Sequence, residues 1–212
     1  MGYKTFVSMN IAIIGCGEIA EAYAAGFAYA GHEVFVALKN GQKGHLSADL
    51  NAFENVQLCS IEAAAEVADL IIIATPPKDV REVAYWLGDV RQKVIIDATG
   101  NVFAHDDELV KTVCAIGAIT GSQLVVKVFQ TAGFEQLLKP IFREEKVELI
   151  LAGDSKKAKE ATKILFRDLG MTHSFDFGDS NTVPLFNELT KCCRNLTQKG
   201  IPQTIIATLP WL

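Results

Sequence analysis

One short motif near the N-terminus has the residue types that phosphate binding requires. Its pattern is G-x-G-x-x-A, and its residues are Gly15, Cys16, Gly17, Glu18, Ile19 and Ala20. The pattern alone is weak, but here it lies between an apolar run and a stretch of helix-forming residues. The first glycine permits a tight turn, the second leaves room for a pyrophosphate, and the alanine allows close helix packing. We expect these six residues to bind a dinucleotide at a helix start; a tight turn without a ligand is the alternative.

The residues after the second predicted strand indicate which dinucleotide the motif would bind. NAD-binding sites usually have Asp or Glu there, about 20 residues after the glycines, to hold the ribose 2′-hydroxyl. This chain has Leu38, Lys39 and Asn40 at that place, with Lys43 close behind. Since a lysine can neutralise a 2′-phosphate, we expect NADP as the cofactor and Lys39 and Asn40 in its site. The alternative is that Lys39 is a solvated loop lysine.

Two later strand ends supply further candidates, because ligands of open α/β sheets bind at the carboxyl ends of the strands. The fourth predicted strand is followed by Thr75, Pro76 and Pro77, which offer the cofactor a hydroxyl group and a stiff loop. The fifth is followed by Ala98 and Thr99, which we also expect in the cofactor site.

Two charged residues at strand ends each have a structural alternative to a role in chemistry. We expect Asp97 to cap a helix or loop rather than to catalyse. Lys127, with Phe129 and Gln130 at the end of the sixth predicted strand, is expected to face the nicotinamide or a co-substrate. A surface lysine is the alternative for Lys127. No catalytic residue is predicted.

The histidines and cysteines do not form a metal-binding pattern. None of the four histidines has a second ligand at helical or hairpin spacing, so no metal site is predicted. His32 follows Gly31 in a predicted turn between helix and strand, and we expect it to be exposed. The five cysteines contain no C-x-x-C pair, which argues against a disulfide framework or a zinc knuckle.

Apolar runs and helix-forming stretches alternate along the chain. Strands are predicted at residues 10–14, 33–38, 56–58, 70–74, 94–96 and 124–129, and helices at 18–30, 44–53, 61–68 and 78–87. Such alternation predicts an α/β fold, a Rossmann-like doubly wound and mostly parallel sheet. Beyond a charged stretch, residues 148–152 and 172–177 are predicted as strands, and 156–168 and 183–199 as helices. We therefore expect a Rossmann domain at 9–142 and a small C-terminal α+β subdomain at 143–212.

The charge and hydropathy of the chain exclude some classes of partner. With 20 basic and 25 acidic residues the net charge is −5, and no basic run is present, so we expect no nucleic-acid partner. No apolar stretch approaches the roughly 18 residues of a membrane-spanning helix. Because residues 1–8 are too short and polar for a signal peptide, we expect a cytoplasmic protein. The apolar residues 204–212 suggest a homodimer; packing on their own chain is the alternative.

Several segments are similar to those of one known family: residues 13–20, 30–34, 68–76, 94–99 and 151–154. Residues 125–131, V-V-K-V-F-Q-T, are also similar to that family's V-V-K-A-F-N-T segment. The chain resembles the NADP oxidoreductases that use the deazaflavin coenzyme F-420, over nearly its whole length. The resemblance implies NADP binding along residues 15–20 and at the end of the second strand. Family members often carry Ser-Arg there, where this chain has Leu38 and Lys39.

The motif and the resemblance together favour hydride transfer between NADP(H) and a flavin- or deazaflavin-type acceptor. Coenzyme F-420, FMN or FAD would then be the small-molecule co-substrate. Such a reaction needs the orientation of two cofactors more than acid–base side chains. One alternative is a small-metabolite dehydrogenase or imine reductase, in the manner of pyrroline-5-carboxylate reductase or the β-hydroxyacid dehydrogenases. These need a long helical domain, for which the chain after Phe142 is short. The other alternative is a non-catalytic NADP-binding sensor.

Overall fold

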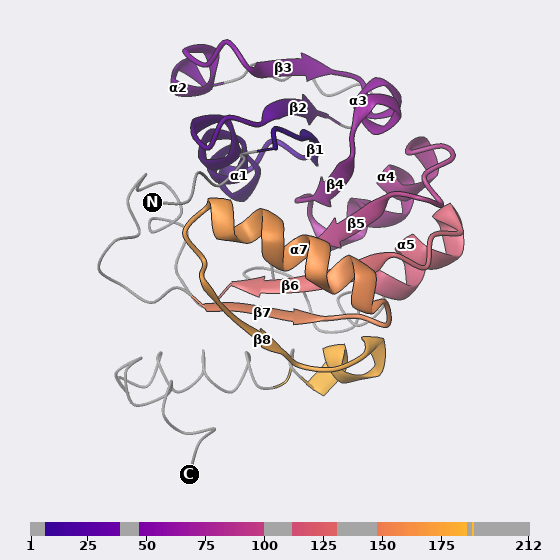
Figure 1. The fold of residues 1–212 in the computed structure, drawn as a ribbon. Coiled ribbons are helices and arrows are strands. Elements are labelled where there is room, and N and C mark those ends of the chain that lie inside the picture. The colour runs from indigo at the N-terminus through magenta and orange to yellow at the C-terminus, as the bar shows by residue number, and fades with distance from the viewer. Residues whose placement is uncertain (1–6, 39–46, 100–111, 131–147, 186–187, 189–212) are drawn as a thin grey trace, which may run out of the picture.

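A computed structural model of the 212-residue chain describes residues 7–38, 47–99, 112–130, 148–185 and 188. Eight strands in this part of the chain form one sheet (Figure 1), in the order β3-β2-β1-β4-β5-β6-β7-β8. The strands are β1 (Asn10–Ile14), β2 (Glu33–Ala37), β3 (Val56–Cys59), β4 (Leu70–Ile73), β5 (Val94–Asp97), β6 (Val125–Gln130), β7 (Glu148–Ala152) and β8 (His173–Asp176).

The first six strands are parallel and have the strand order of a dinucleotide-binding sheet. Every residue of β4 and β5 is buried, as expected for strands that helices cover on both faces. β7 runs antiparallel to β6, and β8 is parallel to β7. The predicted Rossmann-like, doubly wound and mostly parallel sheet with a small C-terminal α+β segment is confirmed.

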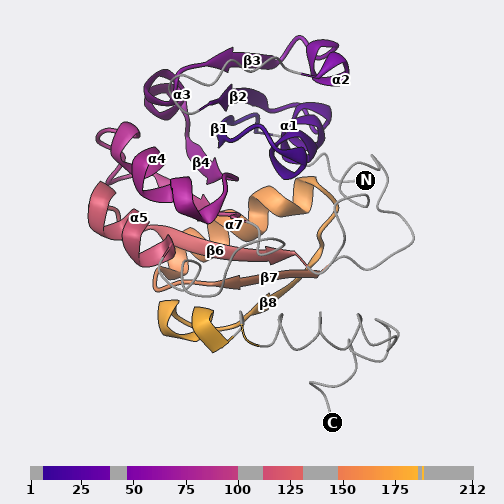
Figure 2. The ribbon, with the colours of Figure 1, turned by 180° about the vertical axis from the view of Figure 1, so that it is seen from behind.

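Helices cover both faces of this sheet, and each face has its own apolar core. α1 (Glu18–Tyr29), α2 (Ala48–Asn51) and α7 (Lys156–Asp168) pack on one face; α3 (Ile61–Val67), α4 (Val80–Trp86) and α5 (Thr112–Thr120) pack on the other. In Figure 1, α7 lies in front of β6 and β7. In Figure 2, which shows the opposite side, α4 and α5 lie in front. Two 3-10 helices, η1 (Pro77–Asp79) and η3 (Ser180–Thr182), complete the described elements.

An aromatic cluster joins α1 to α7, although the two helices lie far apart in the sequence. The ring of Phe166 in α7 packs edge-on against Tyr23 and Phe27 of α1, with ring centroids 5.5 and 5.9 Å away. All three side chains are fully buried. Burial of a large aromatic side chain contributes about 1.5–3 kcal/mol, so this cluster fixes the helix of the glycine motif against the C-terminal segment.

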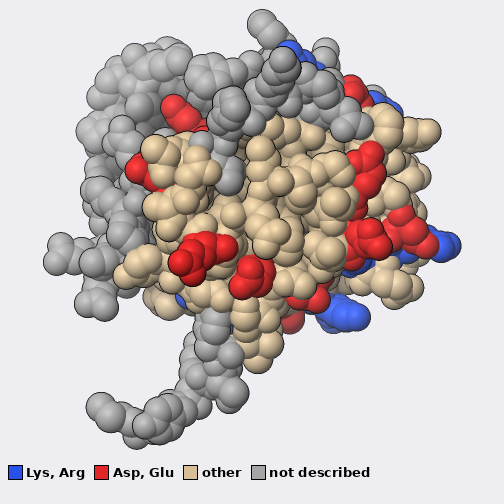
Figure 3. All heavy atoms as spheres, turned by 90° about the horizontal axis from the view of Figure 1, so that it is seen from above, with Lys and Arg blue, Asp and Glu red and all other residues tan. Residues whose placement is uncertain are grey.

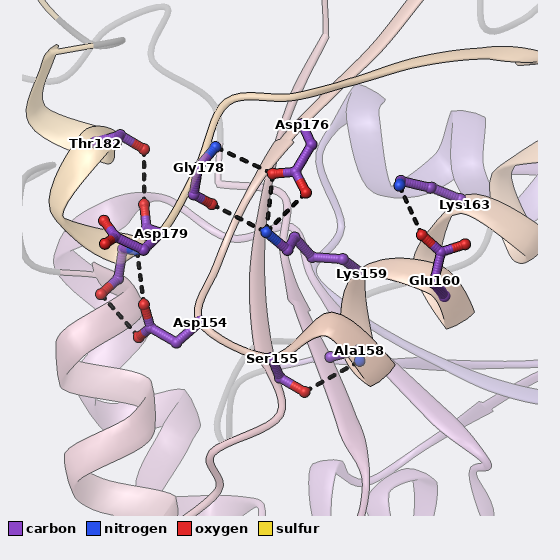
Figure 4. A network of polar contacts seen from close by, with 11 residues as sticks. Asp154, Ser155, Ala158, Lys159, Glu160, Lys163, Asp176, Gly178, Asp179 and Thr182 are labelled. Carbon is purple, nitrogen blue, oxygen red and sulfur yellow. Dashed lines mark hydrogen bonds and ion pairs between the residues drawn. The ribbon is translucent and has the colours of Figure 1, made fainter.

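Polar contacts join α7, β8 and η3 to one another within the segment after β7 (Figure 4). The ammonium group of Lys159 in α7 lies 2.8 Å from a carboxylate oxygen of Asp176 and donates to the carbonyl of Gly178 at 3.3 Å. Asp154 accepts two hydrogen bonds from Ser180, at 2.9 and 2.8 Å. Burial opposes ionisation of Asp176, but bonds from Lys159 and the Gly178 N–H outweigh it and lower the pKa of the carboxyl group. The predicted boundary between residues 142 and 143 lies outside the described residues, and the strands on either side of it, β6 and β7, pair directly.

The helices differ from the predictions in three places. The helix expected at 44–53 is the single turn α2 within the described residues, and the helix expected at 78–87 begins as η1 at Pro77. α5 is not among the helices predicted above. Residues 204–212 and most of the helix expected at 183–199 lie outside the described residues.

The described surface agrees with the charge of the sequence. On the face seen from above in Figure 3, acidic side chains are scattered over an uncharged surface, and the coloured basic ones lie near its margin. Among the coloured residues this face therefore offers no basic patch for nucleic acid. Within the described residues no helix is both long and apolar enough to cross a membrane.

Candidate dinucleotide-binding site

The turn after β1 can be made only by glycine at position 15. Gly15 has a φ of +142°, and a Cβ atom at this residue would lie 2.4 Å from the carbonyl oxygen of Ala74. Its N–H donates to the carbonyl of Ala37 at 2.9 Å. The turn therefore touches the ends of both neighbouring strands, β2 and β4. Ala20 is buried, and its Cβ would be 3.5 Å from a Cβ at Gly15, so a small residue is needed there as well.

The start of α1 is open, as the motif predicts. Gly17 is the N-cap residue and gives the helix no side-chain cap. A Cβ atom at Gly17 would have no heavy atom within 4 Å, so nothing in the described structure fills the space beside it. Cys16 and Glu18 are exposed, and Ile19 is half-buried. The first-turn N–H groups of α1 and its partial positive charge therefore face a space that a phosphate group can enter.

Thr75, at the carboxyl end of β4, carries a buried hydroxyl group with no partner. The residue is 8 % exposed, and its Oγ1 has no hydrogen-bond partner among the described residues. Leaving a buried hydroxyl unpaired costs about 1–3 kcal/mol. Such an atom indicates a ligand that supplies the missing bond. Pro76 next to it is exposed, and Pro77 begins η1, as expected of a stiff loop at the mouth of a site.

The fold brings these features together where the strand order reverses. β1 lies between β2 and β4, and the carbonyl of Ala74, which crowds Gly15, belongs to the residue before Thr75. Open α/β sheets bind ligands at this switch point. An uncapped helix start, an empty space at Gly17 and an unpaired hydroxyl group suit the phosphate and ribose oxygens of a dinucleotide. The described residues of the motif therefore fit the predicted cofactor.

A second group of polar side chains lies at the end of β5 and beside it within β6, and its members bind one another. The ammonium group of Lys127 donates to Asp97 Oδ1 at 3.0 Å and to the carbonyl oxygen and Oγ1 of Thr99, both at 2.8 Å. Asp97 Oδ1 also accepts the N–H and the hydroxyl of Thr99, at 3.0 and 2.6 Å. Asp97 Oδ2 accepts the hydroxyl of Thr112, the first residue of α5, at 2.5 Å.

Asp97 is therefore a loop-capping acid, as predicted, and the surface alternative for Lys127 is wrong. Lys127 is only 2 % exposed, because β6 is covered on both faces and the ammonium group is turned toward Asp97 and Thr99. Ala98 and Phe129 are also buried. Gln130 ends β6, but its side chain, like all of Lys39 and Asn40, lies outside the described residues.

His32 is buried, so its predicted exposure is wrong. Its Nδ1 accepts the N–H of Met9 at 3.2 Å, and its Nε2 lies 3.3 Å from the carboxylate of Asp168. Asp168 ends α7, a helix whose packing over this turn the local sequence does not indicate. Burial lowers the pKa of His32, although the nearby Asp168 carboxylate acts to raise it. The lowered pKa favours the neutral imidazole.

The Asp97–Lys127 pair was not predicted from the sequence, although a signal was present. Asp97 ends one apolar run and Lys127 lies near the end of the next, at equivalent places. Opposite charges at equivalent ends of successive buried parallel strands indicate a cross-strand pair. Thr112 had no such signal. Among the described residues, His, Cys, Asp and Glu side chains nowhere form a group of three that could hold a metal ion.

The fold and the switch-point geometry define a dinucleotide-binding protein of the Rossmann type. Residues 10–101 match the family described as "NADP oxidoreductase coenzyme F420-dependent". The match confirms the resemblance predicted from the sequence for this part of the chain. It also confirms, at the level of the family, the predicted class of protein, an NADP-dependent oxidoreductase. None of the curated proteins compared with the chain matches it.

Solved structures share this fold at low sequence identity. A protein of Arthrobacter sp. FB24, named for a proposed F420-dependent NADP-reductase activity, has a TM-score of 0.72 and 21% identity, covering 91% of this chain and 96% of that one. A hypothetical protein of Sinorhizobium meliloti has a TM-score of 0.69 and 23% identity, covering 86% and 90%. An imine reductase of Myxococcus stipitatus has a TM-score of 0.62 and 15% identity, covering 96% of this chain but 70% of its own. At these identities the likeness shows the fold.

Proposed function

We propose that this protein is an oxidoreductase that binds NADP(H) at the start of α1 and transfers hydride between it and a flavin- or deazaflavin-type acceptor. The observation that carries the proposal is that two groups without hydrogen-bond partners lie close together at the switch point. The N-terminus of α1 has no side-chain cap, and beside the same turn the Thr75 hydroxyl is buried without a partner. One dinucleotide would satisfy both.

Different residues of the proposed site would bind different parts of the cofactor. Gly17 and the first-turn N–H groups of α1 would hold the pyrophosphate, and the Thr75 hydroxyl would hydrogen-bond the ligand beside them. The end of β2 bears no acid: Ala37 is buried, Leu38 is half-buried, and Lys39 follows. The missing acid supports NADP over NAD, with Lys39 and Asn40 at its 2′-phosphate. When bound, NADPH supplies the hydride.

Two observations support a flavin-type acceptor: the match of residues 10–101 to the F420-dependent family, and the pairing of the ionisable groups near the site with each other. Asp97 and Lys127 are buried and paired with each other, so neither is placed to exchange a proton with a substrate. Transfer of a hydride between two ring systems needs no such exchange from the protein. An imine or hydroxy-acid substrate would need a proton donor.

The cofactor is tested by titrating the purified protein with NADPH and NADH while following nicotinamide fluorescence. We expect tight binding of NADPH and at least tenfold weaker binding of NADH, about 1.4 kcal/mol. Equal binding of both would contradict the role of Lys39. Binding of neither would overturn the proposed site.

The Thr75→Val variant is the matched test of the site itself. It removes the unpaired hydroxyl while keeping the shape of the side chain. Since the hydroxyl has no partner among the described residues, the free energy of unfolding of the variant should be about 1 kcal/mol higher, with a higher denaturation midpoint. The variant should nevertheless bind NADPH about five- to tenfold more weakly. A variant with unchanged NADPH affinity would show that the hydroxyl does not meet the ligand.

The acceptor is tested separately, by mixing NADPH and protein with coenzyme F-420, FMN or FAD and following loss of absorbance at the NADPH band. A cyclic imine and a 3-hydroxy acid with NADP serve as matched controls for the alternative reactions. Turnover with a flavin or deazaflavin supports the proposal. Turnover with the imine or hydroxy acid alone would replace it by the metabolite-reductase alternative, and tight binding without turnover would favour a sensor.

A further inference from the structure

We propose that Lys127 is a positioning residue that fixes the part of the site facing the nicotinamide half of the cofactor. It would act through Thr99 and Asp97, without touching cofactor or substrate. The proposal deepens the function proposed above and rests on it. Its starting point is that an ammonium group near the expected site is turned entirely inward.

All three N–H groups of the Lys127 ammonium are used within the protein. Their acceptors, Asp97 Oδ1 and the carbonyl and hydroxyl oxygens of Thr99, lie between 2.8 and 3.0 Å away. The side chain is 2 % exposed, and Phe129 lies 5.8 Å below the nitrogen. A direct bond to a ligand would require one of these bonds to break, and the charge would then be left less well paired in a buried place.

The bonds of Lys127 fix the loop that follows β5. Thr99 is held by four hydrogen bonds at three atoms: its N–H and hydroxyl bond to Asp97, and its carbonyl and hydroxyl bond to Lys127. Thr112 of α5 holds the other oxygen of Asp97. The pair therefore ties β5, β6 and α5 together at the carboxyl edge of the sheet. A buried ion pair adds little net stability compared with apolar residues of equal size, whereas it does select one geometry.

The position of this loop determines which half of the cofactor it affects. In dinucleotide-binding folds, the residue at the end of β2 contacts the ribose of the adenosine half. The adenosine half would therefore lie over β1 and β2. The rest of the dinucleotide then lies across the switch point, over β4, β5 and β6. Asp97 and Lys127 are paired in the β5–β6 register, on that second side. A disturbed β5 loop should weaken contacts to the nicotinamide half and leave those to the adenosine half intact.

The test compares two probes on one double variant. Lys127→Met combined with Asp97→Asn removes both charges and avoids an unpaired buried one. NADPH probes both halves of the site, and 2′,5′-ADP probes the adenosine half alone. We expect the variant to bind NADPH about tenfold more weakly than the unaltered protein and 2′,5′-ADP with the same affinity within about twofold. The unfolding midpoint of each protein is measured alongside.

Two further variants make the result decisive. Thr99→Val removes one bond of Lys127 and should weaken NADPH binding in the same selective way, by a smaller factor. Lys159→Met combined with Asp176→Asn removes a second, more exposed ion pair on the other side of β6 and should leave both affinities unchanged. Equal weakening of both probes, or unchanged NADPH affinity, in the Lys127 variant would overturn the positioning role. If the unaltered protein binds neither probe, the proposed function itself has failed, and this inference fails with it.

Discussion

α1 and α7 pack on the same face of the sheet and touch through aromatic rings, yet they begin in opposite ways. α7 begins at Ser155, whose hydroxyl accepts the N–H of Ala158 at 3.2 Å (Figure 4). α1 begins at Gly17, which has no side chain to offer. Ser155 thus satisfies one N–H group in the first turn of α7, whereas Gly17 offers no side-chain acceptor to the first-turn N–H groups of α1.

The surroundings of the two helix starts differ in the same way. Beside α7, both carboxylate oxygens of Asp154 accept hydrogen bonds from Ser180. Beside α1, the Thr75 hydroxyl is buried and unpaired. The glycine cap lowers stability by a few tenths of a kcal/mol and the unpaired hydroxyl by about 1 kcal/mol or more, and the aromatic contact between the helices offsets this. The comparison supports the ligand site proposed at α1.

Giving α1 a cap should have the largest effect on binding. Gly17→Asp places a carboxylate where the phosphates would lie, and we expect NADPH affinity to fall at least about a hundredfold. The Cβ atom has free space, and Asp is a good N-cap, so stability should hold or rise by a few tenths of a kcal/mol. Fluorescence titration and urea denaturation measure both effects. Gly17→Ala, which adds bulk without charge, is the control, and unchanged binding in the Asp variant would disprove the site.

Breaking the turn before α1 should have the largest effect on stability. In Gly15→Ala the new methyl group would lie 2.4 Å from the Ala74 carbonyl, at a φ of +142°. We expect a loss of about 3 kcal/mol in the free energy of unfolding, from strain and overlap together. Urea denaturation measures it. A loss no larger than that of Gly17→Ala would show that the turn relaxes easily.

Removing the cap of α7 should affect stability alone. Ser155→Ala leaves the Ala158 N–H without its acceptor, and we expect a loss of about 1 kcal/mol. NADPH affinity should stay the same, because α7 takes no part in the proposed site. If NADPH affinity fell as well, the start of α7 would also affect cofactor binding. The difference drawn here between the starts of α1 and α7 would then be wrong.

The smallest expected effect is a pH dependence at the other ends of the two helices, where His32 meets Asp168. Burial holds the pKa of His32 below its ordinary value of 6.5. The unfolded chain therefore binds the proton more readily, so stability is full above pH 6.5 and falls on acidification below it, by at most about 1.4 kcal/mol per pH unit. His32→Asn keeps an acceptor for the Met9 N–H and should flatten the slope between pH 7 and 5.5. An equal slope in the variant would assign the effect to another group.

The local features of the site were predictable because they depend on neighbouring residues. The turn at Gly15, the open start of α1 and the positive φ of Gly31, +91°, follow from glycines acting on their own backbone. The loop-capping role of Asp97 is also local, since its oxygen accepts the N–H two residues on. Buried strands were recognised from continuous apolar runs such as residues 70–74.

The features that failed prediction depend on which distant segments meet. His32 is buried because α7 packs over its turn, and Lys127 is buried because register places it opposite Asp97. The sequence contains the residues of both contacts but not the distances between them.

The amino-acid sequence by itself determined the class of fold, the glycine turn and the residue types at the strand ends. These depend on periodicity and backbone freedom, which act over a few residues. Only the tertiary structure decided that Thr75 is left unpaired while Lys127 is fully paired. Thr75 follows β4 and Lys127 lies within β6 of the same sheet, and whether a polar group at such a place finds a partner depends on what the fold packs against it.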